Sequence, residues 1–287
     1  MQTTIENPMS CYGIGVHSGR KTQLTLKPAK PNTGVIFVRT DVTDVDNKIY
    51  ASYENVFNTT LSTSIKNIAN IQISTIEHLM AAIWGCGLSN VIVEVDGPEV
   101  PIMDGSSKPF VFMIECAGLK ALPAENKHLK LLKEIRVTDG DSEIIASPDE
   151  QAKIDLTIDF NSLAIGKQQH IFTTGASFKD SVADARTFGF LRDLEYLKSK
   201  GLAKGASLDN AIGIDDQDAI LNEDGLRHDN EFARHKMLDL LGDLFLAGSG
   251  VIANIQGFKT SHSLNNKFLR AVFSDPYAYK WVDSSGR

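Results

Sequence analysis

Hydrophobic residues recur at helical spacing between residues 230 and 248, and this pattern predicts a helix over that stretch. Asp229 or Asn230 is a suitable N-cap, and Gly248 suits a left-handed stop at the other end. The helix therefore has one face suited to burial. That apolar face consists of Phe232, Leu238, Leu241 and Phe245.

A second set of residues, His235, Asp239 and Asp243, recurs at intervals of four along the same helix. This spacing places one imidazole and two carboxylates on one side of the helix, one turn apart. Imidazole nitrogens and carboxylate oxygens are zinc ligands, so the stripe is a candidate metal site. The same spacing is also typical of a solvent-exposed polar face, and the stripe alone does not separate the two interpretations.

The segment from Ser74 to Trp84 predicts a second strong helix. Ser74 and Glu77 fit a capping box, in which a glutamate at the third helical position bonds back to the cap. The capping box gives Glu77 a purely structural explanation, whereas His78 beside it has none. An adjacent glutamate and histidine at a helix start can present both groups to one cleft.

The remaining elements follow a mixed order. Strands are predicted at residues 23–27, 34–39, 90–96, 129–137, 142–146, 153–160, 211–214 and 251–255. Further helices are predicted at residues 109–116, 176–184 and 191–200, and after a loop at 257–266. Because no regular βαβ alternation is present, the predicted class is α+β. The polar stretch 121–127 contains a proline and is the best candidate linker, which divides the chain into domains 1–122 and 123–287.

Composition narrows the class of protein. The chain has 287 residues with 42% hydrophobic and 23% charged residues, which is ordinary for a soluble protein of one or two domains. Its net charge of −7 gives no reason to expect a nucleic-acid partner. Cys11, Cys86 and Cys116 are far apart, which favours reduced thiols in a cytoplasm. We see no signal-peptide pattern and no apolar run of the roughly 18 residues that a membrane span needs.

Histidines and carboxylates on two predicted helices could supply the three protein ligands of a catalytic zinc. A glutamate beside a bound water would serve as general base, and a second histidine, kept protonated by a carboxylate, as general acid. From spacing alone this is one hypothesis among others, because an HxxxD order is weaker than an HExxH signature. A zinc peptidase or a metal-stabilised binding protein would also place such residues together. Against these stand the missing HExxH motif and three cysteines that lie outside the constellation.

Several long motifs occur along nearly the whole chain. They are Gly13-Ile-Gly-Val-His-Ser-Gly19, Ser74-Thr-Ile-Glu-His-Leu-Met-Ala-Ala82, Gly97-Pro-Glu-Val-Pro-Ile-Met-Asp-Gly-Ser106, Ala185-Arg-Thr-Phe-Gly-Phe190, the run from Gly225 to Leu244, and Lys259-Thr-Ser-His-Ser-Leu-Asn-Asn266. In these motifs and their order the chain closely resembles the UDP-3-O-acyl-N-acetylglucosamine deacetylases, the zinc amidases of lipid A biosynthesis in Gram-negative bacteria.

The resemblance implies a role for each residue of the constellation. His78, His235 and Asp239 match the family's three zinc ligands, and one catalytic Zn²⁺ is the expected cofactor. Glu77 matches the general base and His262 the general acid. The remaining catalytic matches are Asp243, the carboxylate that pairs with His262, and Thr187, the hydroxyl beside the scissile carbonyl.

The resemblance also implies how the substrate, a nucleotide-sugar lipid, is bound. Lys236 and Lys259 look like substrate-binding residues, and Phe160, Asn161 and Asp193 fall where the family contacts the nucleotide sugar. The stretch 188–214 matches an insert that encloses the acyl chain, whereas its helical spacing alone favours ordinary core packing. The expected lining of this passage is Phe188, Phe190, Leu194, Leu197, Ala203, Ser207, Leu208, Ala211 and Gly213.

The fold implied by the family is two α+β domains of related layered β/α sandwich architecture, each with a small insert. The active site is expected at the domain interface, and the expected protein is a cytoplasmic monomer. Gly213 departs from the family pattern, which usually has a bulkier apolar residue there. That difference bears on the shape of the acyl passage and not on the chemistry.

Overall fold

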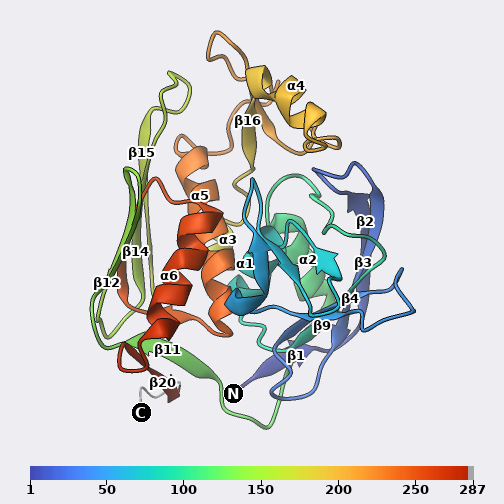
Figure 1. Cartoon of the computed structure of the whole chain (residues 1–287), viewed down its shortest axis with the longest axis vertical. Helices are drawn as coiled ribbons and strands as arrows, with labels where there is room; N and C mark the ends of the chain where they lie inside the picture. Colours follow the sequence, from blue (N-terminus) through green and yellow to red (C-terminus); the bar gives the residue numbers. More distant parts are fainter. Residues whose placement is uncertain (284–287) are drawn as a thin grey trace.

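In a computed structural model, which describes residues 1–283, two five-stranded sheets enclose a layer of helices between them (Figure 1). One continuous hydrophobic core runs through both sheets and the helices, from Leu24 and Phe37 in the first half to Leu156 and Phe268 in the second. The mixed architecture confirms the predicted α+β class.

The first sheet uses alternating strands, as the sequence predicts. In β3, Thr22, Leu24 and Leu26 are buried, and the residues between them are more exposed. This alternation turns one face of the sheet toward the helices. In spatial order the strands are β2 (Met9–Ile14), β3 (Lys21–Pro28), β9 (Val91–Val95), β4 (Val35–Arg39) and β5 (Lys48–Tyr50).

The second sheet repeats the topology of the first. Its strands in spatial order are β12 (Ile135–Asp139), β13 (Ser142–Ser147), β19 (Asn254–Phe258), β14 (Lys153–Asp159) and β15 (Lys167–Thr173). In both sheets the third and fourth strands in this order are parallel, and the other neighbours are antiparallel. The two halves therefore have related architectures.

Four long helices fill the layer between the sheets (Figure 1). They are α1 (Glu77–Gly85), α2 (Lys108–Ala117), α5 (Glu231–Leu244) and α6 (His262–Ser274). In each half one helix precedes the inner strand and one follows it: α1 and α2 flank β9, as α5 and α6 flank β19. The two helices α1 and α5 cross at Gly242, where an added Cβ would lie 2.1 Å from the carbonyl oxygen of Glu77.

Smaller elements complete the chain. The short sheets pair β1 (Thr3–Ile5) with β10 (Leu119–Ala121), β6 (Val56–Asn58) with β7 (Ser64–Lys66) and β8 (Gln72–Ile73), β11 (Lys127–Leu131) with β18 (Val251–Ile252) and β20 (Tyr279–Asp283), and β16 (Phe188–Phe190) with β17 (Ile212–Ile214). The other elements are α3 (Phe178–Ser181), α4 (Leu191–Ser199), η1 (Tyr53–Asn55) and η2 (Phe245–Ala247). Among residues 1–283, each pair of neighbouring strands lies entirely before or entirely after residue 122. The boundary between 1–122 and 123–287 remains a prediction, which this division supports.

The predicted capping box at the start of α1 is wrong. Glu77 is the first residue of the helix, and no side chain caps its start. Ser74 instead pairs with Glu99 in an isolated β-bridge, and Thr75 turns the chain through a left-handed conformation with φ of 58°. This turn separates Ser74 from the helix, so the side chain of Glu77 accepts a hydrogen bond from the Thr63 N–H at 3.0 Å.

Other element boundaries also differ from the prediction. No side chain caps the start of α5, and its last turn tightens into η2 before the predicted left-handed stop at Gly248, which has φ of 88°. The predicted strand 129–137 is two strands, β11 and β12, in different sheets. The predicted helix 176–184 shortens to α3, because Val182 already has non-helical dihedrals.

The crossing of α1 and α5 depends on the missing side chain of Gly242. Since the atom that a Cβ would meet is backbone, we expect Gly242→Ala to lower the free energy of unfolding by about 1–3 kcal/mol. The measurement is denaturant unfolding of metal-free protein. Gly189→Ala is the matched control, because nothing lies within 4 Å of its added Cβ; we expect a change within about 0.5 kcal/mol. A Gly242→Ala protein as stable as wild type would contradict the close crossing.

Candidate metal centre and active site

Three buried side chains from α1 and α5 converge on one point. The carboxylate Oδ1 of Asp239 lies 3.5 Å from Nε2 of His78 and 3.4 Å from Nε2 of His235. The two imidazole rings meet edge to face, with centroids 4.9 Å apart. All three side chains are at least 96% buried. Among the described residues they form the one cluster with metal-ligand geometry.

Unsatisfied polar atoms show that this cluster fits a cation. Asp239 Oδ1 is buried and has no hydrogen-bond partner among residues 1–283. A buried carboxylate oxygen without a partner is costly, and a metal ion between it and the two imidazole nitrogens removes that cost. Two imidazoles and one carboxylate are also the donor set of a three-ligand catalytic zinc site.

The protonation states of the ligands suit metal binding. Burial lowers the pKa of His235 to about 4, so its imidazole is neutral. Burial by itself raises the pKa of Asp239, but His235 and Lys236 beside it bring that pKa well below its usual range. The Ala185 carbonyl lies 3.0 Å from Nδ1 of His235. Since a carbonyl only accepts, the proton of this neutral imidazole sits on Nδ1 and leaves Nε2 free as a ligand.

A second set of buried side chains lies beside the triad and forms an acid–base pair. Nε2 of His262 is 3.9 Å from Oε1 of Glu77, and Nδ1 of His262 is 2.8 Å from Oδ2 of Asp243. Burial by itself lowers the pKa of His262, but the Asp243 and Glu77 carboxylates raise it to about 9. Burial raises the pKa of Glu77. The site therefore holds a protonated imidazole next to a glutamate.

Lys236 contacts the triad directly, and Thr187 lies two residues after Ala185, whose carbonyl contacts His235. Lys236 donates to Oδ2 of Asp239 at 2.8 Å, on the side of the carboxylate away from the two imidazoles. The N–H of Thr187 donates to the Gly105 carbonyl at 2.8 Å, so Thr187 is fixed to a loop of the first half. The next residue, Phe188, places its ring 6.2 Å from the ring of His235.

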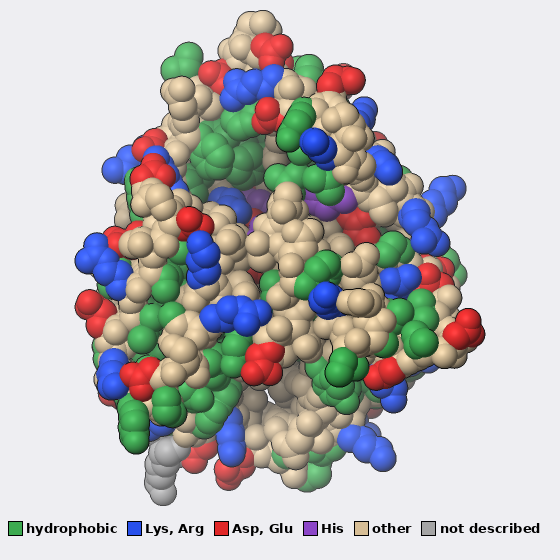
Figure 2. Space-filling view, viewed as in Figure 1, with side chains coloured by type: hydrophobic (Ala, Val, Ile, Leu, Met, Phe, Trp, Pro, Cys, Tyr) green, Lys and Arg blue, Asp and Glu red, His purple; other side chains and the backbone are tan. Residues whose placement is uncertain are grey.

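The predicted insert stands away from the body of the protein, with α4 and β16 at the top of Figure 1. No residue of α4 is buried, so the alternative of ordinary core packing is wrong for this helix. Leu191, Tyr196 and Leu208 are all exposed. Figure 2 shows a hollow lined by hydrophobic side chains below this region, with histidine side chains at its floor. Phe188 in β16, whose ring lies 6.2 Å from the ring of His235, brings the insert up to the triad.

The residues expected to bind substrate fall into two places. Phe160 and Phe188 pack edge to face with centroids 5.6 Å apart, which joins β14 to the insert. Lys259 bonds Asp141 at 2.7 Å and lies 3.7 Å from Asp159, and the bond to Asp141 raises the pKa of Lys259. The remaining predicted substrate-binding residues are partly or fully exposed in or near the insert: Asn161, Phe190, Asp193, Leu194, Ser207 and Leu208.

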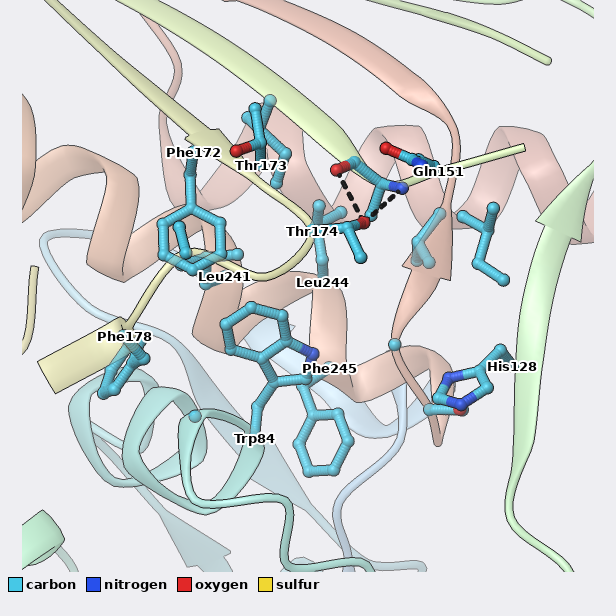
Figure 3. A pocket seen from close by; sticks show the side chains of 18 of the residues that line it. Trp84, His128, Gln151, Phe172, Thr173, Thr174, Phe178, Leu241, Leu244 and Phe245 are labelled. Atoms are coloured by element: carbon cyan, nitrogen blue, oxygen red, sulfur yellow. Dashed lines mark hydrogen bonds between the residues drawn. The ribbon is translucent and has the colours of Figure 1, made fainter. Parts of the chain in front are cut away.

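A cavity of about 680 Å³ lies elsewhere, between the C-terminal end of α1 and the second sheet (Figure 3). The Trp84 ring packs against Phe172 and Phe178, with centroids 5.6 and 6.0 Å apart. Leu244 and Phe245 close another side. None of the predicted metal-binding or catalytic residues lines this cavity in the described part of the chain. The candidate active site is therefore the buried cluster around His78, His235 and Asp239, and not this cavity.

Comparison with known proteins agrees with this geometry. The sequence model of the UDP-3-O-acyl N-acetylglycosamine deacetylase family matches residues 2–274. Relatives named UDP-3-O-acyl-N-acetylglucosamine deacetylase are 46% identical over 285 residues in Photobacterium profundum and in Aliivibrio fischeri, covering 98% of this chain and 93% and 92% of those proteins. The Haemophilus influenzae relative is 45% identical over 284 residues, covering 98% of this chain and 92% of that protein. This chain belongs to the deacetylase family.

Family membership confirms the resemblance drawn from the motifs. The structure also brings together the side chains that those motifs supply: His78, His235 and Asp239 in one cluster, with Glu77 and His262 beside it. Their individual roles in a deacetylase remain predictions. Zinc dependence is a property of the family, and the triad is the place in this chain that suits it.

Several residues that hold the deacetylase site together were missed at the level of sequence. Thr63 donates from Oγ1 to Oδ1 of Asp243 at 2.5 Å, and Asn265 donates to Oδ2 of the same carboxylate at 2.8 Å. Glu99 accepts from the N–H groups of His17 and Ser18 at 2.9 and 2.8 Å. Of the three missed residues, Glu99 and Asn265 lie within the motifs that carry the resemblance, and Thr63 does not. Thr63 gives no sequence signal, because its role depends on a contact 180 residues away.

Proposed function

We propose that this protein removes the N-acetyl group from UDP-3-O-((R)-3-hydroxyacyl)-N-acetylglucosamine, giving acetate and UDP-3-O-acyl-glucosamine. This is the committed step of lipid A biosynthesis. Family membership over residues 2–274 supports the reaction and the substrate class. The observation that carries the proposal is the buried triad, with its unpartnered Asp239 Oδ1, next to the acid–base pair of Glu77 and His262.

His78, His235 and Asp239 would hold the catalytic Zn²⁺ of the family through Nε2, Nε2 and Oδ1 respectively. A bound zinc ion lowers the pKa of a bound water and polarises the substrate carbonyl. The surrounding chain keeps the His235 imidazole neutral and the Asp239 carboxylate anionic, and it buries all three side chains away from water. The Nδ1–H of His235, held by the Ala185 carbonyl, fixes the ligand nitrogen.

Glu77 and His262 divide the proton transfers between them. Glu77 accepts the proton of the attacking water, and its carboxylate is oriented by the N–H of Thr63. His262 donates a proton to the departing amine of the sugar, which is otherwise a poor leaving group. Asp243 keeps His262 protonated through the 2.8 Å contact with its Nδ1. The Thr187 hydroxyl stabilises negative charge on the acetyl oxygen.

The parts of the substrate are assigned to two lysines, to the end of the second sheet and to the insert. Lys236 places a positive charge at the edge of the triad, and Lys259 does so near Phe160 at the end of the second sheet. We assign the nucleotide-sugar part to Phe160, Asn161, Asp193 and Lys259. The acyl chain is assigned to the apolar side of the insert, formed by Phe188, Phe190, Leu194, Ser207 and Leu208, where burial of each methylene contributes about 0.8 kcal/mol.

The cellular setting is part of the proposal. Among residues 1–283, every helix is too short or too polar to cross a bilayer. Cys11, Cys86 and Cys116 form no disulfide. We propose a cytoplasmic enzyme that acts as a monomer on a diffusible nucleotide-sugar lipid.

The test of the function is acetate release from the UDP-3-O-(hydroxyacyl)-N-acetylglucosamine substrate. Activity is measured on the purified protein, after chelation, and after one equivalent of Zn²⁺ is restored. We expect activity to vanish with the chelator and return with zinc. Zinc-loaded protein that releases no acetate at any acyl length would overturn the proposed reaction.

Single substitutions separate metal binding from proton transfer. We expect Asp239→Ala to lose bound zinc, because it removes the unpartnered Oδ1 from the triad. We expect Glu77→Ala to keep zinc and to lose roughly 10²–10⁴-fold in kcat, the usual size of a general-base contribution. Metal content and acetate release are measured on each, with Asp139→Ala as control, since this half-exposed residue forms a surface ion pair with Lys267. A fully active Glu77→Ala enzyme would be incompatible with the mechanism.

The raised pKa of His262 predicts the alkaline limit of activity. Since the general acid must be protonated, kcat/KM should fall as pH rises through about 9. Asp243→Asn removes the main interaction that raises this pKa, while the lowering effect of burial stays, so the alkaline limb should move to lower pH. Full pH profiles of both proteins, with Asp275→Asn as a surface control, check the shift. An alkaline limb that stays in place in Asp243→Asn would contradict the pairing.

A further inference from the structure

Arg186 and Glu231 form a buried ion pair beside the active site that the proposed chemistry does not use. Arg186 is 3% exposed and Glu231 is fully buried. Nε of Arg186 donates to Oε1 of Glu231 at 2.9 Å, and its terminal NH2 nitrogen donates to Oε2 at 3.1 Å. The main-chain N–H of Arg186 also donates to Oε1, at 3.0 Å. One carboxylate therefore fixes both the side chain and the backbone of Arg186.

The pair joins three segments of the chain. Glu231 is the first residue of α5, four positions before the predicted ligand His235. Oε2 of Glu231 accepts the Arg227 N–H at 2.6 Å, and Arg186 donates to the Gly225 carbonyl at 2.7 Å. Arg227 in turn donates to the Asp184 carbonyl at 2.8 Å. The first turn of α5, the loop before it and the segment 184–187 are thus tied together.

The segment 184–187 supplies two contacts on which the site depends. The Ala185 carbonyl accepts from Nδ1 of His235, and Thr187 carries the hydroxyl assigned to the acetyl oxygen. Arg186 is the residue between them, and its backbone N–H is held by Glu231. A shift of Arg186 would therefore move the Ala185 carbonyl and Thr187 at the same time.

The same segment is anchored to the first half of the chain. Arg227 pairs with Asp104 at 3.0 Å, and the Thr187 N–H donates to the Gly105 carbonyl at 2.8 Å. Ser107, two residues after Gly105, donates to the His78 carbonyl at 2.6 Å, so the loop that holds Thr187 also contacts the predicted ligand of the first half. The motifs around Asp104, Arg186 and Glu231 meet at this one place.

We propose that Arg186 and Glu231 are positioning residues that hold the Ala185 carbonyl against Nδ1 of His235, and so present Nε2 of His235 to the metal. The inference rests on the proposed function, since it assumes that the triad binds a metal. The pair does not touch the substrate or the metal. Its effect passes through the backbone of residues 185–187.

A general stabilising role is the alternative, because breaking a buried ion pair destabilises any fold. The two roles differ in what they change. Loss of stability lowers the melting temperature but leaves the metal affinity of the folded protein unchanged. Loss of positioning weakens metal binding and alters the ligand geometry in protein that is still folded.

The experiment compares Arg186→Lys, Glu231→Gln and the double variant with wild type. Arg186→Lys keeps the charge and loses the two-pronged contact, and Glu231→Gln turns one acceptor into a donor facing the Arg227 N–H. Arg39→Lys is the matched control, since Arg39 is 8% exposed and makes a two-pronged contact with Asp41. Zn²⁺ affinity is measured by competition with a chelator, ligand geometry by the absorption spectrum of the Co²⁺-substituted protein, and stability by melting of the metal-free protein.

We expect the Zn²⁺ dissociation constant to rise roughly 10- to 100-fold in both single variants, with a changed Co²⁺ spectrum. The Zn²⁺ dissociation constant of the double variant should be no higher than the higher of the two single-variant values, because the pair acts as one unit. Arg39→Lys should lower the melting temperature and leave the Zn²⁺ affinity and the Co²⁺ spectrum unchanged. Folded variants with wild-type zinc affinity and spectrum would overturn the inference.

A second measurement covers the case in which a variant is too unstable to load with metal. Nitrogen-15 NMR of the metal-free protein reports which ring nitrogen of His235 carries the proton, with the signal assigned by His235→Gln. We expect the Nδ1–H form in wild type and a mixture in Glu231→Gln. An unchanged Nδ1–H signal in Glu231→Gln would overturn the inference. Failure of the proposed function looks different: wild type itself would bind no zinc, or Asp239→Ala would bind it normally.

Discussion

The active site depends on the close crossing of α1 and α5 at Gly242. A side chain at this position would meet the Glu77 carbonyl, so the two helix backbones can touch only because glycine has none. The contact sets Glu77 and His78 on α1 against Asp239 on the neighbouring turn of α5. Neither helix alone holds the triad of His78, His235 and Asp239, and the crossing brings its members together. The packing of the two helices in the core therefore also sets the geometry of the site.

Burying several charged side chains in the core costs free energy, and the site offsets this cost in two ways. The cluster holds three carboxylates, Glu77, Asp239 and Asp243, against two cations, protonated His262 and Lys236, which leaves a formal charge of −1. A bound dication changes this to +1, so the metal contributes to neutralising the carboxylates as well as to the chemistry. The second offset is hydrogen bonding: both oxygens of Asp243 accept from neighbouring side chains. The arrangement suits an anionic nucleotide-sugar substrate.

The sequence predicted which residues of the site lie together better than it predicted the structure around them. The stripe of His235, Asp239 and Asp243 follows from helical spacing alone, and its burial excludes the alternative of a solvent-exposed polar face. The capping-box prediction was wrong because Thr75 adopts a left-handed conformation, which the neighbouring sequence does not predict. Thr63 was missed since its contact with Asp243 depends on tertiary packing. Local periodicity thus identifies which residues share a face, whereas long-range partners require the fold.

The repeated topology of the two halves explains how the site came to lie between them. α1 and α5 occupy equivalent places before the inner strands β9 and β19, and each supplies part of the triad. α2 and α6 are likewise equivalent, yet the residues at their starts differ in use. The N-cap of α2, Ser107, donates to the His78 carbonyl at 2.6 Å, whereas α6 has Ser261 as its N-cap and His262, which pairs with Asp243, as its first residue. The same ends of equivalent helices therefore support the triad in one half and supply the protonated histidine in the other, and an isolated half would lack part of the triad.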